Sequence, residues 1–474
     1  MDIKKLFTNY SDLVLVIIAG AFFRFKNIVV DEFWYDEAFT GILMRLPLKE
    51  YWQIAINDPT PPLYYFAARI FTAFTGVGDF QLRLLSVLFG LATIPLVYST
   101  ARKWFGKESA VISAALIAVS PFFVGYSLEA RAYSMYGFLT ALCLYFLSKN
   151  RLFFFMLTAC AMAITHYTTI FFIIPLIGMY FFIIYKNKFS FSKGVVRILP
   201  LIILLAGSIW YAKTMSSDFV NNEWIEEANL INMTESMGAH LFGVKVKLTG
   251  ADDVNDINLG ITESHISIIV YLVYLGALGY FIYKNKNRLS EEGNFLFVVA
   301  GFILPQLIII TLGWLTKYDL YVERYLFPAA VFFSLSVGYL LEKLLSFEYI
   351  IIVLLAYVFL LSQVSFENYY SGMRGIRDKY DRTSKTVVFT SPIDYVIARY
   401  YMGDNQVNVR LHDFNDPKNT YAYWQMVPES AHINNFADTV IVSPDENRLN
   451  QDEFVQIDIK DDYKIYVKKG SRYE

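Results

Sequence analysis

The sequence predicts a polytopic α-helical membrane protein, with about eleven transmembrane helices and a small C-terminal α/β domain. Three observations lead to this prediction. Of the 474 residues, 55% are hydrophobic and only 18% are charged, whereas a soluble domain usually carries about 25% charged residues. Apolar runs long enough to cross a bilayer recur up to residue 365. After that residue the composition becomes polar, and strand-like segments alternate with helical ones.

The same composition excludes several classes of protein. A hydrophobic chain with 41 Lys+Arg against 43 Asp+Glu is neither disordered nor a basic nucleic-acid-binding protein, and we expect no nucleic-acid partner. The two cysteines, Cys143 and Cys160, both lie in apolar runs. Their number and positions indicate neither a disulfide framework nor a zinc site.

The predicted spans follow from the rule that a spanning helix needs about 20 mostly apolar residues. The first span follows Lys4 and Lys5 and has no small-residue cleavage site, so we interpret it as a retained anchor and not as a signal peptide. The segment 152–165 is the shortest of the set. The predicted spans are 11–30, 81–101, 109–126, 132–148, 152–165, 168–185, 195–213, 265–283, 294–314, 325–341 and 349–365.

Lys and Arg in the short connections predict the orientation. Basic residues gather at 102–107, 149–151, 186–197 and 284–288, whereas the long connection 214–264 is acidic. A cytoplasmic N-terminus places the basic connections inside and the acidic one outside, and an odd number of spans then places the C-terminus outside. We therefore expect a multi-pass protein of the plasma membrane, in which the net charge of -2 is a cancellation between opposite faces.

The first outer connection, residues 31–80, is too apolar for a plain linker. Segments 47–57 and 60–75 each begin near proline and carry apolar residues at helical spacing. This pattern predicts two amphipathic helices on the outer membrane surface.

Residues 366–474 are predicted to form a soluble extracytoplasmic α/β domain, separate from a transmembrane catalytic domain of residues 1–365. Alternating apolar residues predict its strands, and no Gly-rich phosphate loop occurs in it, so we assign it no chemistry. Helical stretches are expected at 393–401 and 421–427. The expected strands are 387–390, 407–411, 439–442, 454–459 and 463–467.

Four carboxylates stand within seven residues just outside the first span: Asp31, Glu32, Asp36 and Glu37. Such a cluster at a membrane surface costs desolvation free energy unless water, cations or partners compensate it. One interpretation is a solvated acidic start to a surface helix, where the helix dipole favours Asp and Glu. The other is a general base at the boundary between water and lipid.

Two further clusters lie on the same predicted side. The proline turn that runs from Asp58 to Pro62 precedes Tyr64 and Tyr65, and by itself it also suits a simple junction between loop and helix. The short turn with Glu129 and Arg131, followed by Tyr133, could form a local ion pair or hold a phosphate through the guanidinium. Other residues predicted at this outer edge are His166, Tyr167, Lys317, Glu323, Arg324 and Tyr325.

A histidine such as His166 is more often a structural residue than a catalyst. The span centres, in contrast to the outer edge, are almost free of charge, which argues against an ion pump or coupled transporter. Any chemistry is therefore expected near the outer leaflet.

The motifs, in this order, resemble the GT-C integral-membrane glycosyltransferases. Within that class they are most similar to the branch that contains protein O-mannosyltransferases and the aminoarabinose transferases that modify lipid A. The resemblance covers residues 1–365 in topology, with its sharpest motifs between 31 and 175. It rests on Asp36-Glu37, on Asp58-Pro59-Thr60-Pro61-Pro62-Leu63-Tyr64-Tyr65, on Glu129-Ala130-Arg131-Ala132-Tyr133, on Thr165-His166-Tyr167 and on Arg324-Tyr325.

The resemblance implies a polyprenyl-phosphate-linked sugar as donor, and an inverting transfer to an acceptor lipid, glycan or protein at the outer face. The family's essential acid maps onto Asp36, with Glu37 beside it. Thr60 stands where the family commonly has His or Lys near the donor phosphate, which weakens a phosphate contact from this loop. The residues implied in binding the donor phosphate or the substrate are Glu129, Arg131, Tyr133, Tyr64, Tyr65, His166 and Arg324.

No feature of the sequence identifies a cofactor with certainty. A divalent cation, Mg²⁺ or Mn²⁺, that bridges Asp36, Glu129 and the phosphate stays an open alternative. Two other functions also remain open at this stage: a transporter or flippase of a lipid-linked sugar, and a membrane-anchored protein that recognises glycan through residues 366–474.

Overall fold

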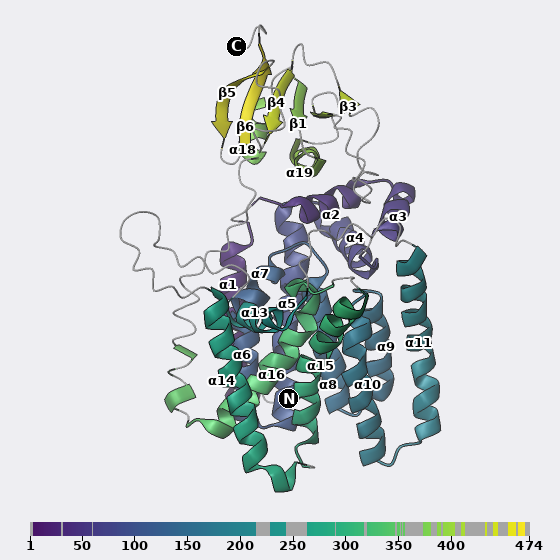
Figure 1. Cartoon of the computed structure of the whole chain (residues 1–474), viewed down its shortest axis with the longest axis vertical. Coiled ribbons are helices and arrows are strands. Elements are labelled where there is room, and N and C mark those ends of the chain that lie inside the picture. Colours follow the sequence, from purple (N-terminus) through teal and green to yellow (C-terminus); the bar gives the residue numbers. More distant parts are fainter. Residues whose placement is uncertain are drawn as a thin grey trace. The chain divides into compact units, whose positions relative to one another are not determined.

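The computed structural model covers the whole chain and forms two compact units (Figure 1). We call Met1–Lys26, Leu84–Ser216 and Asn222–Phe366 the helical unit, and Asn27–Arg83, Ser217–Asn221 and Glu367–Glu474 the loop–sheet unit. The structure describes residues 3–29, 32–58, 60–214, 228–242, 263–289, 291–316, 320–346, 348–350, 352, 354–355, 373–380, 386–389, 392–402, 409–412, 432–433, 439–443, 454–460 and 463–469.

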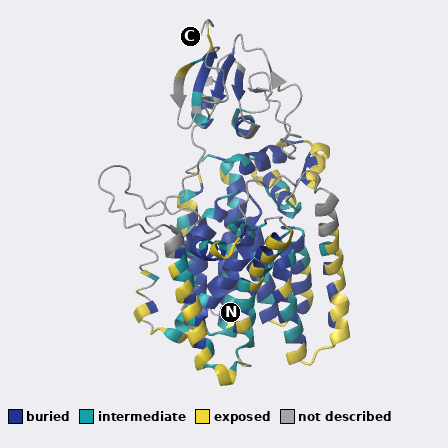
Figure 2. Cartoon of the chain, in the orientation of Figure 1, coloured by how far each residue is buried: buried dark blue, intermediate teal, exposed yellow. Residues whose placement is uncertain are grey.

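The helical unit is a bundle in which most of the long helices run side by side (Figure 1). Its buried residues lie in the middle of the bundle (Figure 2), whereas α11 exposes apolar side chains such as Phe191, Val196 and Ile203, as expected for contact with lipid. The helices are α1 (Ile3–Asn27), α5 (Asp79–Trp104), α6 (Lys107–Val119), α7 (Pro121–Ser127), α8 (Tyr133–Ser148), α9 (Leu152–Ala163), α10 (Thr169–Lys186), α11 (Phe191–Thr214), α13 (Leu230–Phe242), α14 (Glu263–Lys284), α15 (Gly293–Thr316) and α16 (Phe327–Leu344), with 3₁₀ turns η1 (Lys286–Arg288) and η2 (Glu323–Leu326).

The long apolar helices place the chain in a membrane. Among the residues that the structure describes, five helices are long and apolar enough to cross it, and the bent pair α6 and α7 makes a sixth if it is counted as one span. At 16 and 12 residues, α8 and α9 rise about 24 and 18 Å, less than the thickness of about 30 Å of a bilayer core. The expected span 349–365 lies largely outside the described residues, so the total of eleven stays a prediction.

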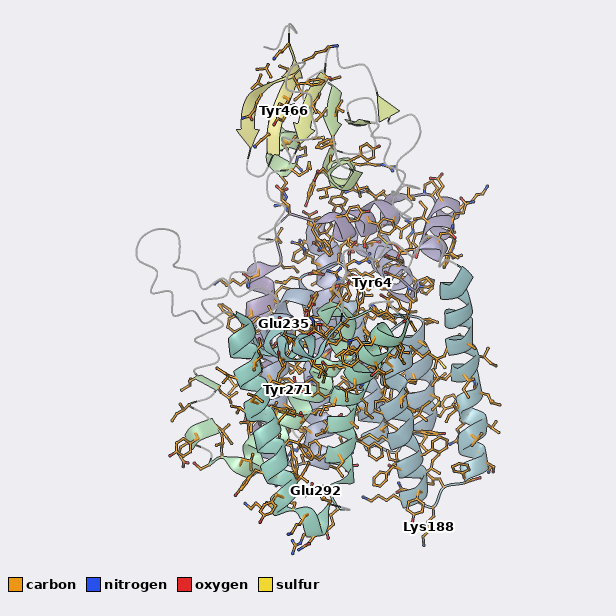
Figure 3. All side chains as sticks on the ribbon, in the orientation of Figure 1. Tyr64, Lys188, Glu235, Tyr271, Glu292 and Tyr466 are labelled. Carbon is orange, nitrogen blue, oxygen red and sulfur yellow. The ribbon has the colours of Figure 1, made fainter. Side chains whose placement is uncertain are left out.

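The ends of the helical unit carry different residues (Figure 3). Lys188, after α10, and Glu292, before α15, lie at one end of the bundle, and Glu235 on α13 lies toward the other. Lys188 belongs to the predicted connection 186–197 and Glu235 to 214–264, most of which lies outside the described residues, so the predicted alternation of the connections stays a prediction.

The break between α6 and α7 has a clear physical cause. The two helices meet at Ser120 with a bend of 51°, because Pro121 lacks the N–H that would bond the Ile117 carbonyl. The buried side chain of Arg24 supplies donors there: Nη1 bonds the Ala118 carbonyl at 2.8 Å and Nη2 bonds the Ile117 carbonyl at 3.3 Å. Helix α1 thus completes the hydrogen bonding that the proline interrupts.

We expect Arg24→Met to lower the free energy of unfolding by about 3 kcal/mol, because it leaves buried carbonyls at the break without donors. The matched control is Lys26→Met, two residues further along α1, where the side chain is exposed. Thermal unfolding of both variants in the same detergent would measure the effect. Equal stability of the two variants would contradict this role of Arg24.

The loop–sheet unit joins three helices of the first outer connection to a sheet and two helices near the C-terminus. A six-stranded sheet has the order β3-β2-β1-β4-β6-β5, parallel from β3 to β4 and antiparallel at β6 and β5. The elements are α2 (Tyr35–Arg45), α3 (Leu48–Asn57), α4 (Leu63–Thr75), α18 (Met373–Tyr380), α19 (Pro392–Met402), β1 (Thr386–Phe389), β2 (Val409–His412), β3 (His432–Ile433), β4 (Thr439–Ser443), β5 (Phe454–Lys460) and β6 (Tyr463–Lys468).

Many of these elements lie where the sequence predicted them. The five expected strands overlap β1, β2, β4, β5 and β6, the helix expected at 393–401 is α19, and the two amphipathic segments are α3 and α4. The helix expected at 421–427 lies outside the described residues. Helix α2 was expected only as one of two interpretations of the acidic cluster, and the short strand β3 was not predicted.

The compact units do not follow the predicted division at residue 365. Residues 27–83 pack with the chain after residue 366. The physical reason is that α2 and the segment before it pack against α19: the Arg45 guanidinium lies 4.3 Å from the centroid of the Tyr400 ring, and the Phe33 and Tyr400 rings stack with centroids 4.9 Å apart.

Candidate active site

Helix α2 carries the first candidate residues, Asp36 and Glu37, in its first turn, where the helix dipole stabilises negative charge. Every residue from Asp36 to Met44 is buried. The exposed fractions of Asp36 and Glu37 are 7% and 0%. The interpretation of these residues as an acidic start to a helix is therefore confirmed, but its expectation that they are solvated is wrong, because both are buried.

Arg83 accounts for the burial of Glu37. Its Nε and Nη2 atoms donate to the two carboxylate oxygens of Glu37 at 2.8 and 2.7 Å, as a bidentate ion pair. The remaining donors reach the carbonyls of Ile28 at 3.3 Å and Glu32 at 3.1 Å, and the guanidinium lies 5.0 Å from the centroid of the Phe33 ring. Sequence reasoning missed Arg83, although an arginine one turn inside an apolar helix was the signal for it.

The pairing separates the roles of the two adjacent carboxylates. Consecutive helical residues point about 100° apart, so Asp36 projects from a different face of α2 than Glu37. The Asp36 carbonyl accepts a hydrogen bond from the Thr40 hydroxyl, one turn further along α2, at 2.9 Å. Arg83 already neutralises Glu37, and Asp36 is therefore the stronger candidate for accepting a proton.

The proline turn is organised by Asp58, which is buried. Its Oδ1 accepts hydrogen bonds from the Thr60 backbone N–H at 2.7 Å and from the Tyr65 hydroxyl at 3.2 Å. Tyr64 and Tyr65, both on α4, are also buried (Figure 3 labels Tyr64). Their hypothesised contact with substrate stays a prediction, whereas the bond from Tyr65 to Asp58 gives Tyr65 a structural role.

The helical unit holds a second cluster, centred on His166 in the turn between α9 and α10. The His166 ring stacks on the Tyr136 and Tyr167 rings at 5.0 and 4.7 Å between centroids, and lies 5.1 Å from that of Tyr325. Its Nδ1 is 2.8 Å from Thr168 Oγ1. These contacts fix the imidazole as a packed, hydrogen-bonded residue.

Charged residues surround this aromatic cluster. Burial, followed by the positive charges of Arg131 and Arg324, lowers the pKa of His166 to about 3. Glu129 and Arg324 both interact electrostatically with Tyr126, whose ring packs against Tyr133 at 5.2 Å.

Five of the predicted phosphate- or substrate-binding residues are therefore brought together in the helical unit. They are Glu129, Arg131, Tyr133, His166 and Arg324. The cluster combines two guanidinium groups and one carboxylate with an uncharged imidazole and a tyrosine hydroxyl, and this excess of positive charge suits an anionic ligand better than a cation.

The other predicted residues belong to the loop–sheet unit or lie outside the description. Asp36, Glu37, Tyr64 and Tyr65 are in the loop–sheet unit. Asp31, Pro59 and Lys317 are outside the described residues. Within the described part of the chain, no group of three or more His, Cys, Asp or Glu residues could hold a metal ion. The cation bridged by Asp36 and Glu129 stays untested.

We expect Arg83→Met to destabilise the protein by about 3–5 kcal/mol, because it leaves the Glu37 carboxylate buried without its counter-ion. Replacing both partners, as Glu37→Leu with Arg83→Met, should recover much of that loss. Unfolding of the single and double variants in detergent would measure both effects. A double variant that is less stable than Arg83→Met alone would contradict the pairing.

The lowered pKa of His166 predicts a dependence of stability on pH. An unfolded histidine binds a proton below about pH 6.5, whereas His166 in the folded protein stays neutral down to about pH 3. Its contribution is thus complete above pH 6.5 and is lost as the pH falls from about 6.5 to about 3. Between about pH 7 and pH 5, His166→Gln should lose about 2 kcal/mol less stability than the native protein. If the free energy of unfolding changed by the same amount in the two proteins over this range, the lowered pKa of His166 would be refuted.

Comparison with known proteins agrees with the predicted resemblance to GT-C glycosyltransferases, in fold and in local sequence. A family model described as dolichyl-phosphate-mannose-protein mannosyltransferase matches residues 59–211, which include the proline turn after Asp58, the turn with Glu129 and Arg131, and His166. The whole chain also has the fold of a solved protein of this class.

That protein is ArnT from Cupriavidus metallidurans. Its structure in the apo state aligns with a TM-score of 0.63 and 10% identity, over 97% of this chain and 98% of that one. Its structure bound to undecaprenyl phosphate aligns with a TM-score of 0.57 and 10% identity, over 96% and 98%. A sequence relative, an uncharacterized protein of Aquifex aeolicus, is 29% identical over 211 residues, which are 42% of this chain. The match spans about half of that relative, 48% of its length.

Proposed function

We propose that this chain is a membrane glycosyltransferase that moves a monosaccharide from a polyprenyl-phosphate donor to a lipid, glycan or protein acceptor. The observation that carries the proposal is the gathering of Arg131 and Arg324 around the neutral His166. This arrangement suits a phosphate. The fold supports the proposal, because ArnT, with a similar fold, has been solved with undecaprenyl phosphate bound.

The proposed chemistry is an inverting displacement at the anomeric carbon. Asp36 removes the proton of the acceptor hydroxyl, whose oxygen attacks the anomeric carbon from the side opposite the phosphate. The bond between that carbon and the phosphate oxygen breaks, and its electron pair leaves with the polyprenyl phosphate. Arg131 and Arg324 stabilise the negative charge that develops on this leaving group.

The proposed location of the reaction is the outer face of the plasma membrane. The basic connections at 102–107, 149–151, 186–197 and 284–288 argue for a cytoplasmic side. With the N-terminus on that side, the first connection, with Asp36, is extracytoplasmic, and so is the C-terminal part. In this orientation, a donor in the outer leaflet lies on the same side of the membrane as Asp36.

We expect two variants to separate catalysis from donor binding. Asp36→Asn should lower transfer by at least about 100-fold while binding of undecaprenyl phosphate is retained, because only the proton acceptor is lost. Arg131→Ala should instead weaken binding of undecaprenyl phosphate by about 10- to 100-fold, because a charge-assisted contact is lost. The measurements are transfer from a panel of radiolabelled polyprenyl-phosphate sugars, and lipid binding to the purified protein in nanodiscs.

The matched controls are Asp378→Asn and Arg377→Ala, which change an exposed carboxylate and a partly exposed guanidinium on α18. Neither control should alter transfer or binding. Full transfer by a folded Asp36→Asn protein would remove Asp36 as the base, and unchanged lipid affinity of Arg131→Ala would remove Arg131 from the phosphate site. Mass spectrometry of lipid that co-purifies with the native protein would identify the donor.

A further inference from the structure

We propose that Tyr400, on α19, sets the rotation of helix α2 and thereby the direction in which Asp36 points. This proposal rests on the proposed function of Asp36 and extends it to the C-terminal part of the chain, to which the sequence assigned no chemistry. Tyr400 is in this view a positioning residue, and it acts through α2 without touching substrate.

One face of α2 is held along its whole length. Glu37, Gly41 and Arg45 are spaced by four residues, so they form one stripe of the helix. Glu37 pairs with Arg83. Gly41 and Arg45 both meet Tyr400: a methyl group at Gly41 would overlap the Tyr400 ring, and the Arg45 guanidinium lies 4.3 Å from the centroid of that ring. Arg45 Nη1 also donates to the Tyr400 carbonyl at 2.7 Å.

This stripe determines where Asp36 points. Asp36 is about 100° around the helix from Glu37 and about 140° from Gly41, so it projects away from the face that α19 covers. A small turn of α2 about its axis would move the Asp36 carboxylate while leaving the helix intact. The absence of a side chain at Gly41 lets the Tyr400 ring lie directly on the α2 backbone, where it opposes such a turn.

Asp79, at the start of α5, holds Tyr400 in place. Its Oδ1 accepts the Tyr400 hydroxyl at 2.8 Å, and its Oδ2 accepts the Tyr401 hydroxyl at 2.9 Å and Arg374 Nη2 at 2.6 Å. Burial, and then the charge of Asp79, raises the pKa of both tyrosines well above the usual value. Both hydroxyls therefore remain donors at every working pH.

The segment that enters α2 is tied to the same elements. The Glu32 carboxylate accepts the backbone N–H groups of Met373 and Arg374 at 2.8 and 2.9 Å, at the N-terminus of α18, where a carboxylate is favoured. The Phe33 backbone N–H donates to the Tyr401 hydroxyl at 2.6 Å. Both the approach to α2 and the face that carries Gly41 and Arg45 are thus held by residues of α18 and α19.

The test uses the full-length protein with Tyr400→Leu, and with Arg377→Met on α18 as the matched control. Hydrogen exchange of α2 peptides, measured by mass spectrometry, reports the order of α2 whether or not the protein is active. Tyr400→Leu should increase exchange in α2 and lower kcat by about 100-fold, because a displacement of about 1 Å misplaces the base. The KM for a radiolabelled undecaprenyl-phosphate sugar should stay within about twofold. The control should change none of these.

A second arm tests the contact between Tyr400 and Gly41 directly. Gly41→Ala should by itself lower kcat, since the added methyl group pushes α2 away from the ring. In the presence of Tyr400→Leu, which removes the ring, Gly41→Ala should cause little further loss, so the two effects are not additive. Additive losses would show that the two residues act independently, which would overturn the proposal.

Unchanged exchange in α2 of Tyr400→Leu would also overturn it, as would an equal loss in kcat and in donor affinity. If Tyr400→Leu does not fold, Tyr400→Phe replaces it, because it keeps the ring and removes only the hydrogen bond to Asp79. A native protein that transfers no polyprenyl-phosphate sugar would refute the proposed function instead, and the exchange data would still decide whether Tyr400 orders α2.

Discussion

Arg83 binds a buried carboxylate, and the structure around helix α2 depends on this contact. An ionised Glu37 without a counter-ion would cost several kcal/mol at its buried position. Arg83 removes that cost through two short hydrogen bonds and uses its remaining donors on the carbonyls of Ile28 and Glu32. The end of the first helix, the segment before α2 and the start of α5 are therefore joined at one guanidinium.

The two clusters of candidate residues, one in each compact unit, differ in their electrostatics. The loop–sheet unit supplies carboxylates, of which Glu37 is neutralised by Arg83 and Asp36 faces another side of α2. The helical unit supplies Arg131 and Arg324 around a histidine that stays uncharged. Each cluster by itself has a charge environment of its own: carboxylates of which one is paired with an arginine in the loop–sheet unit, and guanidinium groups beside an uncharged imidazole in the helical unit.

Local pattern predicted those elements whose side chains separate into two faces. Helices α3 and α4 show an apolar stripe, and the strands show alternation, so both were found from sequence. Helix α2 was expected only as one interpretation of its acidic start, because its residues from Asp36 to Met44 are all buried and a helix without a polar face has no apolar stripe to detect. The bend at Ser120 was missed because residues 109–126 are apolar throughout, although Pro121 was a direct signal for a break.

The contacts that hold α2 were beyond the reach of sequence for another reason. Asp79 and Tyr400 are 321 positions apart, and nothing in the neighbourhood of either residue reveals the other. A tyrosine in an apolar helix is usually a core residue. Here the Tyr400 ring packs on Gly41 of α2, and the Tyr400 hydroxyl donates to the Asp79 carboxylate, which also accepts a hydrogen bond from Arg374. Because one aspartate anchors both α18 and α19 beside the helix that carries the candidate base, a disturbance of the C-terminal segment reaches Asp36 through packing alone.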